Sequence, residues 1–198
     1  MIIIKAVIAV IVCYLIGSFS FAQFFAKRYR KVNIYRSGDH TADASNVYRN
    51  ISKPVGVLVW ILDFLRVYVI LWVGGKIFFP SNPLILLLIG MAIIVGHYLP
   101  IHNKFIGGHE IITYVGLLLY FAPFPTIIVI VLALLLILFF NQARFATYLI
   151  VIFTPILCYI FQYFKILDSI RIDAKYLIIT SILMGLINLF VTKRKGEI

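Results

Sequence analysis

Long apolar blocks alternate with short polar segments along the chain. The apolar blocks cover about residues 2–25, 54–79, 84–101, 111–122, 125–140, 145–164 and 176–191. Most of them approach the roughly 20 residues that a helix needs to cross the hydrocarbon core of a bilayer. Prolines lie between several blocks, at Pro80, Pro83, Pro123 and Pro125, and favour breaks there. The pattern predicts an all-α integral membrane protein with about seven transmembrane helices, in a single domain over residues 1–198.

The block at 111–122 is shorter than the others. A helix of this length is too short to cross a bilayer alone. A half-membrane helix is tolerated where its broken end lines a cavity rather than lipid. We therefore expect one of the seven helices to be short or to cross only half of the membrane.

The composition agrees with this class of protein. Hydrophobic residues make up 63% of the chain, charged residues only 13%, and the mean hydropathy is +1.07. A soluble domain has roughly a quarter of its residues charged. The composition therefore excludes an ordinary soluble domain.

The charge distribution predicts the orientation. The net charge is +11, and the loop between residues 26 and 53 holds seven Lys and Arg against two Asp. Because cytoplasmic loops carry the excess of Lys and Arg, this loop is expected inside and the N-terminus outside. Seven crossings then place the basic tail at 193–195 and the C-terminus in the cytoplasm. The same charge favours contact with membrane lipids, and we expect no nucleic-acid partner.

Two opposite charges lie within one apolar block. Asp63 and Arg66 are three residues apart, so they share one face of a helix. Ionised side chains are costly in lipid and usually pair or face the interior of the bundle. We expect a structural ion pair here rather than a proton relay.

Small and sulfur-containing residues in the apolar blocks are interpreted as packing residues. Gly17, Ser18 and Ser20 are small enough to let a neighbouring helix approach closely. Cys13 and Cys158 lie in separate apolar blocks, without the spacing of a metal or redox motif. Both cysteines are expected to pack as small hydrophobic side chains.

The segment Gly96 to Thr113, with the sequence GHYLPIHNKFIGGHEIIT, concentrates polar residues between two apolar blocks. Gly107 and Gly108 permit positive φ and bring bare N–H groups close to a ligand. The apolar residues that follow are able to open a helix whose N-terminus attracts anions. The segment therefore predicts a phosphate or carboxylate site.

A second polar segment runs from Ser37 to Arg49 and contains residues typical of turns. If Ser45 caps a short helix, Arg49 projects from its first turns. An arginine in this position is able to bind a phosphate with two parallel hydrogen bonds. Snorkelling towards the lipid surface explains the same residue equally well.

These segments resemble a known family. Gly96-His97, Pro100, Lys104-Phe105, Gly107-Gly108 and Thr113 match without gaps the second signature of the bacterial acyl-phosphate glycerol-3-phosphate acyltransferases, which make lysophosphatidic acid. Other parts of the chain are similar to that family in the same order: Tyr14–Ser18, Ala44–Val47 with Arg49, Gly56–Arg66 and Arg144–Thr147. The resemblance covers nearly the whole chain.

The resemblance implies a seven-span enzyme of the bacterial plasma membrane, with its active site on the cytoplasmic side. It implies that acyl phosphate and glycerol 3-phosphate are the substrates, and that neither a cofactor nor a metal ion is needed. By alignment, Arg49 and His109 are the implied catalytic residues. The implied substrate-binding residues are Ser37, Asn46, Lys104, Gly107, Gly108 and Thr147.

Several positions depart from the family pattern. His109 replaces the lysine that follows the paired glycines, so a permanent charge becomes one that depends on pH near neutrality. Glu110 replaces the next glycine. An ungapped alignment puts Asp39 at the serine of the first signature, whereas Ser37 fits only with two extra residues. The chain also lacks the family's C-terminal histidine, and Asn188 is the candidate for the asparagine near it.

Two functions therefore remain open. The first is acyl transfer from acyl phosphate to glycerol 3-phosphate, with Lys104 beside His109 to supply positive charge. The second is a catalytically silent relative that binds a lipid or a protein partner, as the altered positions suggest. A transporter or channel is a weaker third interpretation, because few charges lie within the apolar blocks.

Overall fold

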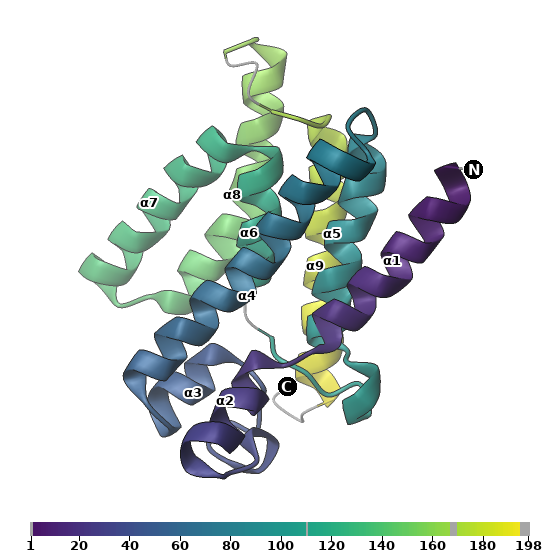
Figure 1. Ribbon diagram of the computed structural model, residues 1–198. Helices are drawn as coiled ribbons and strands as arrows, with labels where there is room; N and C mark the ends of the chain where they lie inside the picture. Colours follow the sequence, from purple (N-terminus) through teal and green to yellow (C-terminus); the bar gives the residue numbers. More distant parts are fainter. Residues whose placement is uncertain (1, 110, 167–169, 195–198) are drawn as a thin grey trace. The chain divides into compact units, whose positions relative to one another are not determined.

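The computed structural model describes residues 2–109, 111–166 and 170–194, and the regular structure in these ranges is helical (Figure 1). Within these described ranges, six segments are long and apolar enough to cross a membrane: Ile2–Arg30, Lys53–Phe78, Pro83–Asn103, Pro123–Phe140, Phe145–Tyr163 and Ala174–Val191. Helix α6 (Ile112–Phe121) is apolar but shorter. The prediction of an all-α, multi-pass membrane protein with one short helix is confirmed.

The chain divides into two compact units, Met1–Gly116 and Leu117–Ile198. Each unit is described below by itself. The assignment of residues 1–198 to a single domain stays a prediction.

In the first unit, α1 (Ile2–Ser18) and α5 (Pro83–Tyr98) lie side by side (Figure 1). A Cβ atom at Gly17 would overlap the backbone of Ile93, and one at Gly96 would overlap the carbonyl oxygen of Tyr14. Glycine on each helix therefore lets the two backbones approach. This contact confirms that Gly17 is a packing residue.

The first apolar block does not form one helix. Helix α1 ends at Ser18, and α2 (Phe21–Arg30) begins after Ser20, whose side chain accepts a hydrogen bond from the Gln23 N–H at 3.0 Å. Ser20 thus caps a new helix instead of packing within the first one, because its hydroxyl replaces a missing backbone acceptor. The last turn of α2 carries Lys27, Arg28 and Arg30.

A small apolar cluster joins α2, the 3-10 helix η1 (Ile34–Arg36), α3 (Ala44–Asn50) and α4 (Lys53–Val73). Its buried members are Ala22, Ala26, Ile34, Ala42, Ala44, Val47, Ile51 and Val59. Because half of these residues are alanines, the backbones of these elements come close together. The cluster holds the polar loop between η1 and α3 against the start of α4.

The predicted ion pair in α4 is confirmed. Arg66 Nη2 lies 2.6 Å from Asp63 Oδ1, and the two side chains are only 4% and 1% exposed. Arg66 also donates from Nη1 to the Phe19 carbonyl at 2.6 Å and contacts His97 Nδ1 from Nη2 at 3.0 Å. The pair therefore links α4 to the end of α1 and to the last turn of α5. The π-helical turn η2 (Gly74–Phe78) follows α4.

The second unit contains α7 (Pro123–Phe140), α8 (Ala143–Tyr163) and α9 (Ala174–Arg194), and α8 packs against both other helices. The Gln162 side chain fixes the entry into α9, because its Nε2 donates to the Ile172 carbonyl at 2.7 Å and its Oε1 accepts from the Ala174 N–H at 2.8 Å. Cys158 in this unit and Cys13 in the first are buried free thiols, as predicted.

Candidate functional site

The polar loop of residues 37–43 is held by the side chain of Asn46 on α3. Asn46 Nδ2 donates to the carbonyls of Thr41 at 2.8 Å and Ser37 at 3.0 Å, and Oδ1 accepts from the Asp39 N–H at 3.3 Å. Asn46 is fully buried. Asn46 therefore shapes the loop. That Asn46 binds substrate stays a prediction.

Gly38 makes the bend of this loop possible. Its φ is +59°, in the left-handed region that favours glycine. A Cβ atom there would also overlap the side-chain amides of Asn46 and Asn50. The bend brings the next residue, Asp39, back over α3.

Asp43 caps α3, a place that the sequence assigned to Ser45. The buried Asp43 carboxylate accepts the Asn46 N–H at 2.9 Å and the Ser45 hydroxyl at 3.0 Å. The hydroxyl of Ser45 therefore donates to the cap and does not form it. An Asp directly before the first residue of a helix is a recognised capping pattern, so this signal was present in the sequence.

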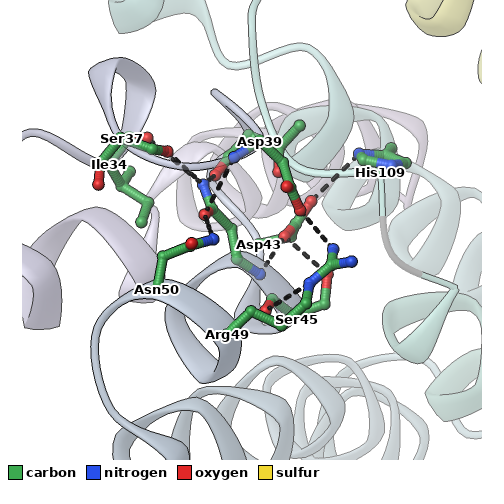
Figure 2. A network of polar contacts seen from close by, with 10 residues as sticks. Ile34, Ser37, Asp39, Asp43, Ser45, Arg49, Asn50 and His109 are labelled. Carbon is green, nitrogen blue, oxygen red and sulfur yellow. Dashed lines mark hydrogen bonds and ion pairs between the residues drawn. The ribbon is translucent and has the colours of Figure 1, made fainter.

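Asp43 also contacts a predicted catalytic residue. His109 Nδ1 lies 3.1 Å from Asp43 Oδ2 (Figure 2). Burial acts to raise the pKa of the Asp43 carboxyl, but the hydrogen bond and positive charge of His109 outweigh it, helped by the Asn46 N–H. The pKa of Asp43 consequently lies well below its usual range. Asp43 is therefore an anion that faces the imidazole.

Arg49 faces the polar loop. Its Nη2 forms an ion pair with Asp39 Oδ2, and its Nε donates to the Ser45 carbonyl at 3.4 Å (Figure 2). The side chains of Arg49 and Asp39 are 61% and 41% exposed. Of the two interpretations left open for Arg49, the pairing with a polar site is the one that this geometry favours. Asp39, rather than Ser37, provides the side chain beside it.

Gly107 and Gly108 form a turn, here called the diglycine turn, in which glycine is required for a different reason from the one expected. Among the described glycines, positive φ occurs at Gly38 and not at Gly107 or Gly108. A Cβ atom at Gly107 would overlap the His97 carbonyl oxygen, and one at Gly108 would lie 2.7 Å from His97 Nε2 and 2.8 Å from the Ala42 carbonyl oxygen. Close approach of other groups therefore requires glycine here, not a left-handed backbone.

The backbone amides of this turn are also less available to bind an anion than expected. The Gly108 N–H donates to the His97 carbonyl at 3.2 Å, so it is not a bare donor. Helix α6 begins only at Ile112, beyond the two glycines. Binding of an anion by the Gly107 amide stays a prediction.

The turn and the polar loop lie together in the first unit. The approach of Gly108 to Ala42 and the contact of His109 with Asp43 join the two segments, which are far apart in the sequence. Lys104 is exposed in the turn after the 3-10 helix η3 (Ile101–Asn103), with φ of 54°. The two polar segments singled out in the sequence, residues 37–49 and 96–113, therefore meet.

The remaining candidates are placed as follows. Ser37 is partly buried, and its carbonyl accepts from Asn46. Thr147 is partly buried on α8, and Asn188 lies on α9, both in the second unit. Glu110 lies outside the described residues. Among those that are described, no three His, Cys, Asp or Glu side chains gather in a way that could hold a metal ion.

Replacing Gly107 with alanine is expected to lower the free energy of unfolding by about 1–3 kcal/mol, the usual cost of overpacking a tight contact. The reason is the overlap with the His97 carbonyl oxygen. Gly185→Ala is the matched control, since nothing lies within 4 Å of its added Cβ, and alanine in a helix should be neutral or stabilising. Denaturant unfolding in detergent measures both variants. Equal stability of the two variants would contradict the close-approach explanation.

The fold and the site together define a multi-pass helical membrane protein with a compact polar site, in which an arginine and a histidine are each paired with an aspartate. Residues 7–197 match the glycerol-3-phosphate acyltransferase family, and the chain belongs to that family.

Individual relatives agree with this assignment. The chain is 34% identical over 119 residues to a glycerol-3-phosphate acyltransferase of Aquifex aeolicus, covering 60% of this chain and 61% of that protein. The corresponding protein of Syntrophomonas wolfei is 28% identical, with 65% of each chain covered. Glycerol-3-phosphate acyltransferase 2 of Bacillus anthracis is 29% identical over 178 residues, 90% of each chain. The match thus spans somewhat under two thirds of the first two relatives.

A solved structure shares the fold. The chain is similar to the crystal structure of PlsY (YgiH), an integral membrane glycerol 3-phosphate acyltransferase, in its glycerol 3-phosphate form. The TM-score is 0.78 at 23% identity, and the similarity covers 98% of this chain and 90% of that one.

Proposed function

We propose that this protein transfers a fatty acyl group from acyl phosphate to a hydroxyl group of glycerol 3-phosphate, which forms lysophosphatidate. The observation that carries the proposal is the arrangement of Arg49 and His109. They come from distant parts of the sequence, yet both face the polar loop of residues 37–43 beside the diglycine turn. Membership of the acyltransferase family supports the same reaction.

The protein needs to supply little covalent chemistry for this reaction. Acyl phosphate is a mixed anhydride, so the acceptor hydroxyl oxygen attacks the carbonyl carbon directly. A new ester C–O bond forms, the bond from the carbonyl carbon to the phosphate oxygen breaks, and phosphate leaves with the bonding electrons. The hydroxyl proton passes to a phosphate oxygen. The protein contributes positioning and positive charge around the two phosphates.

The residues take the following proposed roles. Arg49 binds the phosphate of glycerol 3-phosphate with parallel hydrogen bonds. Protonated His109, with Lys104, supplies positive charge to the acyl phosphate. Further donors come from the Gly107 amide and the Ser37 side chain, and Asn46 shapes the loop that holds Ser37.

The proposed setting is the bacterial plasma membrane, with the N-terminus outside and the C-terminus in the cytoplasm. The basic residues at the end of α2 and in the following loop support this orientation, since such residues are retained on the cytoplasmic side. The polar site belongs to that same loop and to α3. It therefore opens towards the cytoplasm, where soluble glycerol 3-phosphate is available.

The test uses the purified full-length protein with palmitoyl phosphate and glycerol 3-phosphate, and it follows the release of inorganic phosphate. We expect release of phosphate that depends on glycerol 3-phosphate. Reactions without glycerol 3-phosphate provide the background.

Absence of turnover would contradict the proposal. If activity then appeared after His109→Lys combined with Glu110→Gly, the site would be one that has lost catalysis. The protein would in that case act as a silent relative that binds a lipid or a partner.

A further inference from the structure

We propose that Asp39 competes with the acceptor's phosphate for Arg49, and that it is thereby the residue that sets the affinity of the site for anionic acceptors. The inference rests on the proposed function for the identity of the acceptor. It goes beyond that function because it assigns a role to Asp39, whose negative charge is otherwise unexplained in a site for anionic substrates.

The first observation is the ion pair itself. Asp39 Oδ2 contacts Arg49 Nη2, and both side chains are partly exposed at the surface of the loop (Figure 2). A guanidinium presents a planar fork of donors that fits two oxygens of a carboxylate or of a phosphate. The carboxylate and an incoming phosphate therefore use the same donors and exclude each other.

The second observation is that the loop holds the carboxylate in place. The backbone N–H of Asp39 donates to Asn46 Oδ1 at 3.3 Å. The side-chain amide of Asn46 also donates through Nδ2 to the carbonyls of Ser37 and Thr41, on either side of Asp39. Gly38 has no room for any side chain. Since the loop backbone is fixed by buried contacts, Asp39 reaches Arg49 without ordering a flexible segment.

The third observation is the charge balance of the site. Two carboxylates, Asp39 and Asp43, face two potential cations, Arg49 and His109. Asp43 is buried and caps α3, so it cannot be removed without loss of the helix start. Asp39 is exposed and contributes no cap. It is therefore the carboxylate that an incoming phosphate can displace from its partner.

The expected effect follows from the exposure of the pair. Exposed ion pairs correspond to at most about a fivefold change in an equilibrium constant. We therefore expect Asp39→Asn to tighten the binding of glycerol 3-phosphate by up to about fivefold. Uncharged glycerol should bind equally to both proteins.

The experiment measures equilibrium binding of glycerol 3-phosphate to the full-length protein in detergent, for Asp39→Asn, Arg49→Ala and the double variant. The gain from Asp39→Asn should disappear in the Arg49→Ala background. Asp39→Glu should keep the weak binding of the original protein. Asp173→Asn is the matched control, because it removes one exposed, paired carboxylate in the second unit and should leave affinity unchanged.

Three outcomes would overturn the inference: unchanged or weaker binding by Asp39→Asn, a gain that persists without Arg49, or an equal gain in Asp173→Asn. A melting curve of each variant shows whether it folds, and Asp39→Ser serves as the second replacement if Asp39→Asn does not. Turnover separates the two proposals. If the original protein has no activity, the acyltransferase proposal fails while the binding comparison still decides the role of Asp39. If it has activity, Asp39→Asn should lower KM and leave kcat unchanged.

Discussion

Replacing Arg49 with alanine is expected to lower kcat/KM for glycerol 3-phosphate by about 100-fold or more, the usual scale for losing a charged donor in an active site. Arg49 faces the polar loop beside the diglycine turn, with its guanidinium paired to Asp39. Its loss leaves Asp39 without its cationic partner near the proposed phosphate position, while Asp43 keeps the imidazole of His109. Phosphate release at several concentrations of glycerol 3-phosphate measures the effect.

The control for this prediction is Arg36→Ala. Arg36 is an exposed arginine at the end of η1, close in sequence to the polar loop. The two variants remove the same charge, so a general change in surface potential would affect both. Activity of Arg49→Ala within a few-fold of Arg36→Ala would show that Arg49 does not bind the phosphate.

Replacing Asp63 with alanine is expected to lower the free energy of unfolding by about 3–5 kcal/mol, the usual cost of leaving a buried charge unpaired. Asp63 is the anionic partner of Arg66, and both side chains are almost completely buried. The guanidinium also contacts the carbonyls of Ile16 and Phe19 and the rings of Phe21 and His97, none of which carries a negative charge. Unfolding by denaturant in detergent micelles measures the loss.

The double variant Asp63→Leu with Arg66→Met separates an unpaired charge from a general packing defect. Buried ion pairs are often replaced by apolar residues at little cost, so the double variant should be more stable than Asp63→Ala. Asp173→Asn removes an exposed charged partner of Lys175 and should cost little, because asparagine is still able to accept the hydrogen bond from the Lys175 N–H. If the double variant were less stable than Asp63→Ala, the two side chains would stabilise the fold by more than cancelling each other's charge.

The ion pair and the membrane spans illustrate what could be predicted from the sequence. Both depend on local regularities: the length of an apolar block fixes whether a helix can cross a bilayer, and a spacing of three residues puts Asp63 and Arg66 on one helix face. The family signatures belong to the same category, because the matched residues lie close together within each segment.

The first apolar block shows the limit of such reasoning. Hydrophobicity continues through residues 2–25, yet the helix stops at Ser18 and a new one starts at Phe21. The hydroxyl of Ser20 fits equally well in a packed helix or at a cap. The choice is made by the buried cluster that holds Ala22 and Ala26 against the neighbouring elements.

The sequence by itself determined the class of fold, most of its apolar helices, its basic loop and the two polar segments that carry the site. The tertiary structure alone decided which polar groups meet: Asp39 with Arg49, Asp43 with His109, and the diglycine turn with the His97 carbonyl. The physical reason is that helix formation depends on neighbouring residues, whereas these pairs join loops whose positions are set by buried contacts far away in the chain.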